Sequence, residues 1–135
     1  MRHFVVASHG KLAEGMMSAL NIIMGDIENI RCFTAYLDLS EDVEKKVADL
    51  VDEYPEEDEL VVITDVYGGS VCNMFVRHLD KPNLHIIAGM NLGMLLEVLV
   101  NRDKPLNDLI DIAVNSGKQA VCYCNQKLDD DEDFD

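Results

Sequence analysis

The stretch FVVASHGKLAEGM, at positions 4–16, joins a short apolar strand directly to an amphipathic helical pattern. His9 ends the strand and Gly10 follows it, so we expect the imidazole at the carboxyl end of a strand, beside the first turn of a helix. Free backbone N–H groups and the positive end of the helix dipole favour bound anions at such a position. Because histidine is also a nitrogen nucleophile at neutral pH, the stretch suggests a histidine that carries phosphate.

Alternating strand and helix patterns continue along most of the chain. We expect strands over 3–8, 30–36, 60–64 and 84–88, and helices over 11–24, 40–54, 70–79, 92–100 and 105–117. Ser40 and Ser70 are expected helix N-caps, and Ser116-Gly117 is an expected helix end. This order predicts an α/β fold, in which a mainly parallel open sheet is sandwiched by helices. A last strand over 119–124 follows two consecutive helices, so we expect it at a sheet edge, antiparallel or exchanged with a second copy.

Length and composition indicate one globular domain over residues 1–125, followed by an acidic tail over 126–135. The chain has 135 residues, of which 48% are apolar and 27% are charged, as in ordinary globular proteins. Six of the last seven residues are acidic, so we expect this tail to be disordered and solvated. The formal net charge of −15 argues against nucleic acid and against an anionic membrane surface as direct partners.

Neither a membrane segment nor a metal site is expected from the sequence. The apolar runs are far shorter than the roughly 20 residues that span a bilayer, and the N-terminus lacks a signal-peptide pattern, so we expect a cytoplasmic protein. Four cysteines have no metal-type spacing, and we expect reduced, partly buried thiols: Cys32, Cys72, Cys122 and Cys124. We therefore expect no metal and no cofactor.

Three glycine-containing turns are expected at one edge of the sheet: 8–10, 64–70 and 88–92. In open α/β sheets, ligands bind beyond the carboxyl ends of the strands, where the strand order reverses. Asp65 follows its strand as His9 follows the first, so its carboxylate can accept a hydrogen bond from one imidazole nitrogen. That bond would fix the tautomer and leave the other nitrogen free to attack. Ser70, after Gly68-Gly69, can offer a hydroxyl and nearby amides to phosphate oxygens.

Each of these features alone also has a structural explanation. A single histidine after a strand is more often structural than catalytic, Asp65 could cap a turn, and Gly68-Gly69 could be only a tight turn. The remaining histidines, which are His3, His78 and His85, are expected to be structural or to face solvent. Only the combination of motifs, in order and at domain-wide spacing, favours a functional site.

That combination resembles the enzyme IIA domain of the mannose family of the sugar phosphotransferase system. The resemblance rests on Ser8-His9-Gly10, on Thr64-Asp65-Val66-Tyr67-Gly68-Gly69-Ser70 with Asn73, and on Ala88-Gly89-Met90-Asn91-Leu92-Gly93-Met94-Leu95-Leu96-Glu97. It extends from the first strand to about Gly117. The family commonly has proline where this chain has Val71 and Gly93, and these changes remove no chemical group.

The resemblance implies a phosphohistidine relay protein. His9 would accept phosphate from the histidine-containing phosphocarrier protein and pass it to enzyme IIB for sugar uptake, while Asp65 orients the imidazole. The phosphate-binding residues would be Gly10, Gly68, Gly69 and Ser70. The family also forms homodimers that exchange the last strand, and it meets the membrane only indirectly, through the transporter subunits.

Because both donor and acceptor would be proteins, the site should be shallow and open. We expect its partner-contacting rim to consist of Tyr67, Val71, Met90 and Asn91. Three alternatives stay open at this point. They are a regulator that binds a target according to its phosphorylation state, a phosphoryl donor of the dihydroxyacetone kinase type, and a plain binding module for a small anion.

Overall fold

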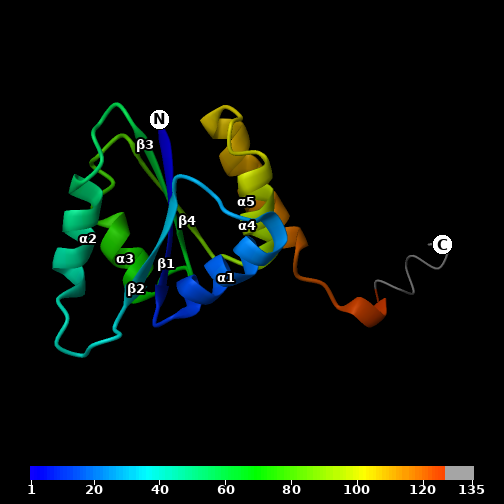
Figure 1. The fold of residues 1–135 in the computed structure, drawn as a ribbon, viewed down its shortest axis with the longest axis horizontal. Helices are drawn as coiled ribbons and strands as arrows, with labels where there is room; N and C mark the ends of the chain where they lie inside the picture. Colours follow the sequence, from blue (N-terminus) through cyan, green and yellow to red (C-terminus); the bar gives the residue numbers. More distant parts are fainter. Residues whose placement is uncertain (127–135) are drawn as a thin grey trace.

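The fold is built around a four-stranded parallel sheet, seen in a computed structural model that describes residues 1–126 (Figure 1). The strand order is β2-β1-β3-β4, with strands β1 (Arg2–His9), β2 (Ile30–Ala35), β3 (Glu59–Thr64) and β4 (Leu84–Ala88). The helices are α1 (Leu12–Met24), α2 (Val43–Asp52), α3 (Ser70–Val76), α4 (Leu92–Val100) and α5 (Leu106–Gln119). The predicted α/β class with a parallel open sheet is confirmed.

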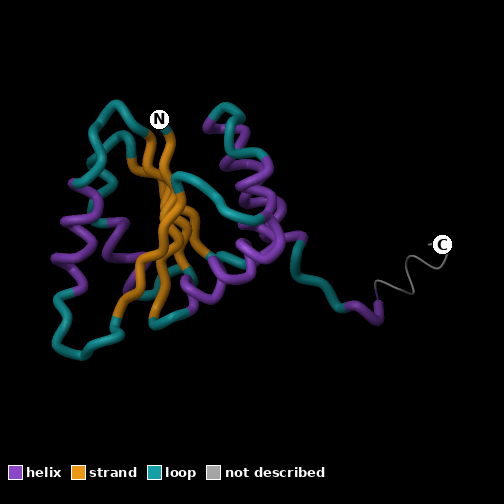
Figure 2. The backbone as a smooth tube through the Cα atoms, in the orientation of Figure 1, coloured by secondary structure: helices purple, strands orange, loops and turns teal. Residues whose placement is uncertain are grey.

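Helices cover both faces of the sheet. Helices α2 and α3 lie on one face, and α1, α4 and α5 lie on the other (Figures 1 and 2). The central strands therefore bury both sets of side chains: Val6 and Ile63 join one apolar cluster, whereas Val5 and Val62 join the other. This is why β1 and β3 are apolar without alternation. Within the described part of the chain, no helix is long and apolar enough to cross a membrane.

The strand order reverses between β1 and β3. β1 pairs in parallel with β2 on one side and with β3 on the other, and the register places Ala7 opposite Thr64. The carboxyl ends of both strands therefore lie at the same edge of the sheet. Because this edge is the carboxyl end of every strand, the fold itself brings His9 and Asp65 together at the point where ligands bind in such sheets.

Two expected helix boundaries are wrong, each for a local reason. Asp42, not Ser40, is the N-cap of α2, and its side chain accepts a hydrogen bond from the Lys45 N–H at 3.1 Å. The Ser40 hydroxyl instead donates to Asp38 at 2.8 Å. Gly117 does not end α5, because it lies inside the helix against α4, where an added Cβ would meet the Met94 Cε at 2.5 Å. That glycine therefore provides close helix packing.

The strand expected over 119–124 is not a strand in the single chain. Gln119 is the last residue of α5, residues 121–123 have no regular structure, and a helical turn follows over 124–126. The segment leads away from the body of the protein (Figure 2). A short strand has no stability without a partner strand, and in the part of the chain that the structure describes this segment pairs with none of the four strands. The acidic tail expected over 126–135 lies outside the described residues, except for Gln126.

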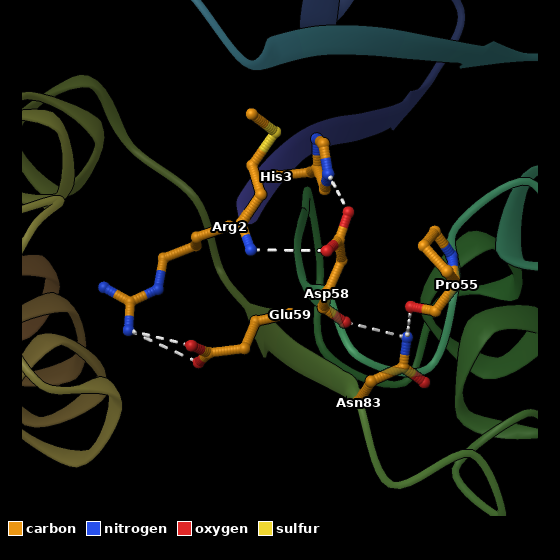
Figure 3. A network of polar contacts seen from close by, with 7 residues as sticks. Arg2, His3, Pro55, Asp58, Glu59 and Asn83 are labelled. Carbon is orange, nitrogen blue, oxygen red and sulfur yellow. Dashed lines mark hydrogen bonds and ion pairs between the residues drawn. The ribbon is translucent and has the colours of Figure 1, made fainter.

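A polar network fastens the opposite end of the sheet (Figure 3). Arg2 pairs with both carboxylate oxygens of Glu59 at 3.3 Å, and the His3 Nε2 lies 2.9 Å from the Asp58 Oδ2. The N-terminal ammonium lies 3.3 Å from the other Asp58 oxygen. The hydrogen bond with His3 is the largest cause that holds the pKa of the Asp58 carboxyl below its ordinary value, and the ammonium adds to it.

The lowered pKa of Asp58 predicts how the stability of the fold changes with pH. A carboxyl whose pKa is lower in the folded state stabilises the fold above its ordinary pKa, and this contribution is lost as the pH falls through the lower, folded value. Asp58→Asn should therefore reduce the free energy of unfolding at pH 7, and the difference from wild type should vanish in acid. Urea unfolding at a series of pH values measures this, with the exposed Asp111→Asn as control. A difference that persisted at the acid end would contradict the assignment.

Candidate functional site

His9 and Asp65 are in direct contact at the carboxyl edge of the sheet. His9 is the last residue of β1, with a side chain 44% exposed, and Asp65 directly follows β3, with a side chain only 9% exposed. The His9 Nδ1 lies 2.7 Å from the Asp65 Oδ2, and the backbone N–H of His9 donates to the same oxygen at 2.8 Å. The carboxylate therefore fixes both the backbone and the ring of His9; the contact with the ring was predicted from the sequence, and the contact with the backbone was not.

The charge on Asp65 determines the tautomer of His9. Burial acts to raise the pKa of the Asp65 carboxyl, but hydrogen bonds from the His9 backbone and ring and from the Val66 N–H outweigh it and hold this pKa below its ordinary value. An ionised carboxylate has no proton to donate, so the proton in the contact belongs to the His9 Nδ1. In the neutral ring, the lone pair is then on Nε2, which faces away from Asp65.

Ser70 lies on the Nε2 side of the ring. Its Oγ is 3.1 Å from the His9 Nε2, and because that nitrogen carries the lone pair, the serine hydroxyl is the donor. The expected capping role of Ser70 is wrong. Gly69 is the N-cap of α3 and Ser70 is the first residue of the helix, so its hydroxyl is directed at His9.

The structure adds Tyr36, which the sequence reasoning missed. Its ring stacks on His9, with centroids 5.6 Å apart and planes 26° apart, and its hydroxyl donates to the Ser70 Oγ at 2.9 Å. Tyr36 immediately follows β2, which is the other neighbour of β1. The available signal was its position at the end of the expected strand over 30–36, because neighbouring parallel strands end at the same sheet edge.

Four residues were predicted to bind phosphate: Gly10, Gly68, Gly69 and Ser70. In two of them, the backbone N–H already donates a hydrogen bond within the fold. The Gly10 N–H donates to the Ala35 carbonyl at 2.7 Å, and the Gly69 N–H donates to the Val66 carbonyl at 3.2 Å. An added Cβ on Gly69 would lie 2.6 Å from the Val66 Cγ1 and 3.4 Å from the His9 Cε1. A side chain at position 69 would therefore clash with Val66, whereas it would make only ordinary van der Waals contact with the imidazole. Gly10, with φ of +54°, allows the chain to turn from strand to helix.

The predicted rim is only partly at the surface. Tyr67 is 86% exposed, but Val71 and Met90 are buried in the two apolar clusters, so the prediction that they contact a partner is wrong. The Asn91 side chain is occupied within the fold, because it caps α4 and donates to the Gly117 carbonyl at 3.0 Å. The sequence located these residues on loops or helix starts at the right edge but could not tell which side chains turn inward.

Cysteines and metal ligands do not gather at this site within residues 1–126. Cys72 is buried and Cys32 is half-buried, whereas Cys122 and Cys124 are exposed beyond α5. No group of three or more histidine, cysteine or acidic side chains in this part of the chain is arranged to hold a metal ion.

NMR can observe the tautomer of the His9 ring directly. In long-range ¹H–¹⁵N NMR spectra, recorded at a pH where the ring is neutral, His9 should be protonated on Nδ1 and unprotonated on Nε2. Asp65→Ala removes the acceptor and should abolish this preference, whereas the signals of His85 in β4 should not change. A wild-type ring protonated on Nε2 would refute the proton assignment.

The chain is similar in sequence to known proteins of one family. The family model described as "PTS system fructose IIA component" matches residues 3–113. The chain is 30% identical over 122 residues to the PTS system mannose-specific EIIAB component of Escherichia coli (strain K12), covering 87% of this chain and 38% of that protein. It is 23% identical over 128 residues to the PTS system fructose-specific EIIA component of Bacillus subtilis (strain 168), covering 93% of this chain and 88% of that protein. The chain thus spans well under half the length of the EIIAB relative.

Solved structures are similar over nearly the whole chain. A candidate permease of the phosphoenolpyruvate-dependent sugar phosphotransferase system from Klebsiella pneumoniae has a TM-score of 0.90 at 37% identity, covering 94% of this chain and 93% of that one. The mannose/sorbose specific IIA subunit from Enterococcus faecalis has a TM-score of 0.75 at 27% identity, covering 90% and 93%. Since the family model matches most of its length, this chain belongs to the family of PTS system fructose IIA components, which are enzyme IIA components of sugar phosphotransferase systems.

Proposed function

We propose that this chain is a phosphohistidine relay protein that works in the cytoplasm. It accepts a phosphoryl group on the His9 Nε2 from the histidine-containing phosphocarrier protein and passes it to enzyme IIB. The observation that carries the proposal is the contact of Nδ1 with the ionised Asp65 at 2.7 Å, because it leaves the Nε2 lone pair on the outer side of a half-exposed ring. Membership of the IIA family supports the same assignment.

The chemistry requires positioning and charge stabilisation more than proton transfer. The bond between phosphorus and the donor histidine breaks as a bond to the His9 Nε2 forms. Because Nδ1 keeps its proton, the phosphorylated ring carries positive charge, and the adjacent Asp65 carboxylate stabilises it. Ser70 stands beside Nε2 and supplies a hydroxyl to a phosphoryl oxygen. Gly68 stays in the proposed phosphate-binding set, whereas Gly10 and Gly69 act through the backbone shape described above.

The surface around His9 suits brief contact with partner proteins. Exposed apolar side chains come from the loops and helix that meet at the site: Leu12 is 48% exposed, Val66 is 51% exposed and Tyr67 is 86% exposed. Small apolar contacts of this kind favour transient complexes, in which the donor and acceptor proteins exchange rapidly. We place the partner rim on these residues.

The proposal includes a homodimer. Within the described residues, β4 pairs only with β3, and beside its open edge lies an apolar cavity of about 370 Å³ between α3 and α5. The segment after α5 presents exposed apolar side chains at alternate positions, with Val121 78% exposed and Tyr123 68% exposed. Pairing of this segment with β4 of a second copy would bury both and complete the sheet edge.

Phosphorylation tests the relay. With phosphoenolpyruvate, enzyme I and the phosphocarrier protein, the wild-type chain should gain one acid-labile phosphate per molecule. His9→Ala should abolish this labelling, because it removes the accepting nitrogen, whereas His78→Ala, in the turn after α3, should label normally. Incorporation is measured with labelled phosphate or by mass spectrometry at alkaline pH.

The fate of the label separates the alternatives. Discharge to an enzyme IIB supports the relay, whereas a stable label that changes binding to a target would indicate a regulator. Discharge to a kinase subunit would indicate the dihydroxyacetone kinase type of donor. Persistent labelling of His9→Ala, or reversible binding of phosphate without a covalent label, would refute the proposed function.

Analytical ultracentrifugation tests the dimer. The wild-type chain should sediment as a dimer at micromolar concentrations, and the double variant Val121→Asp with Tyr123→Asp should sediment as a monomer, because charge cannot be buried in the apolar cavity. Ile22→Asp on the exposed side of α1 is the control and should remain dimeric. A monomeric wild-type chain would contradict the proposed exchange.

A further inference from the structure

We propose that Tyr36 is a positioning residue of the relay. Its hydroxyl fixes the direction of the Ser70 hydroxyl, and its ring forms one wall of the space occupied by His9. This inference rests on the proposed function and assigns a role that the motifs around His9, Asp65 and Ser70 do not contain. Four observations carry it: a hydrogen bond, a stacked ring, a left-handed backbone and partial exposure.

The backbone of Tyr36 is in a conformation that its residue type disfavours. Among the described residues, only Asn29 and Tyr36 have positive φ without being glycine, at 62° and 67°. Asparagine adopts this region readily, but for a bulky aromatic residue it is an outlier. Tyr36 is 37% exposed, so burial of the ring in the core does not explain the strain. Strain of this kind persists where the surrounding contacts impose it, and it is frequent at functional sites.

Tyr36 directly follows the residue that joins β2 to the turn after His9. The Gly10 N–H donates to the carbonyl of Ala35 at 2.7 Å, so the end of β2 is tied to the turn that follows His9. Directly after this tie, the left-handed residue turns the chain so that the Tyr36 ring lies over the imidazole and its hydroxyl reaches α3. Tyr36 therefore links the turn after His9 to α3.

The hydrogen bonds around His9 form a chain with a single direction. The Tyr36 hydroxyl donates to the Ser70 Oγ, the Ser70 hydroxyl donates to the His9 Nε2, and the His9 Nδ1 donates to Asp65. Ser70 has only one proton. Because its oxygen accepts from Tyr36, that proton is directed toward the position where the phosphoryl group bonds to nitrogen.

The same arrangement operates after transfer. When the bond from phosphorus to Nε2 forms, the lone pair that accepted from Ser70 is used, and the bond from phosphorus to the donor histidine breaks. The Ser70 proton then turns to a phosphoryl oxygen, while its Oγ continues to accept from Tyr36. No proton leaves the site, since Nδ1 keeps its own. Tyr36 thus holds Ser70 in position in both states, and its ring limits rotation of the imidazole.

Two variants separate the contribution of the Tyr36 hydroxyl from that of its backbone conformation. Tyr36→Phe keeps the ring and removes the hydroxyl, and it should slow transfer from the phosphocarrier protein about fivefold to tenfold, the effect of one lost hydrogen bond. The loss should appear in the rate at saturating donor, with little change in KM. The half-life of phosphorylated His9 should also change, because a phosphoryl oxygen loses a fixed partner. Tyr54→Phe, near the opposite end of the sheet, is the matched control.

Tyr36→Gly tests whether the residue is retained for folding. Glycine adopts positive φ without strain, so this variant should be at least as stable to urea as the wild-type chain, yet its transfer should be slower than that of Tyr36→Phe. A purely structural role would instead lower stability and activity together.

The outcomes distinguish this inference from the proposed function. If wild-type His9 takes label and Tyr36→Phe matches it in both transfer rate and half-life, the role of Tyr36 is overturned and the relay stands. If wild-type His9 takes no label, the relay itself is overturned, and the role of Tyr36 with it.

Discussion

A single carboxylate oxygen organises the site. The Asp65 Oδ2 accepts from both the backbone N–H and the ring Nδ1 of His9, at 2.8 and 2.7 Å. The first bond fixes the end of β1 against the end of β3, and the second fixes the tautomer and orientation of the imidazole. Because the carboxylate is largely shielded from water while the ring is half-exposed, the negative charge lies behind the imidazole and the Nε2 lone pair lies on the side away from Asp65.

The sheet makes this contact possible without any long loop. Two adjacent parallel strands end at the same edge, so the last residue of β1 and the first residue after β3 come into contact although they are 56 positions apart. The helices on both faces bury the central residues of β1 and β3, which makes the two strands a rigid support for the site. The relay that we propose would benefit from such rigidity, because in-line transfer between proteins depends on a nucleophile that is already oriented.

Several features of the sequence were sufficient to predict the fold and the centre of the site. The continuous apolar run of β3 indicated a doubly covered parallel strand, and the positions of His9 and Asp65 directly after strands predicted their contact. Prediction failed where the outcome depended on competition between nearby groups. Asp38 captured the Ser40 hydroxyl, Gly117 was needed for packing inside α5, and the segment after α5 had no strand to pair with in the single chain.

The sequence by itself therefore determined the order of strands and helices from β1 to α5, the α/β class, and the residue types at the strand ends, because these follow from hydrophobic periodicity and local turn chemistry. The tertiary structure decided which side chains at that edge face solvent, which amides are already used, and that Tyr36 stacks on His9. Val71 and Met90 turned inward, and Ser70 turned from its own helix to the imidazole. These outcomes depend on how three loops from separate strands pack against one another, and no local pattern in the sequence contains that information.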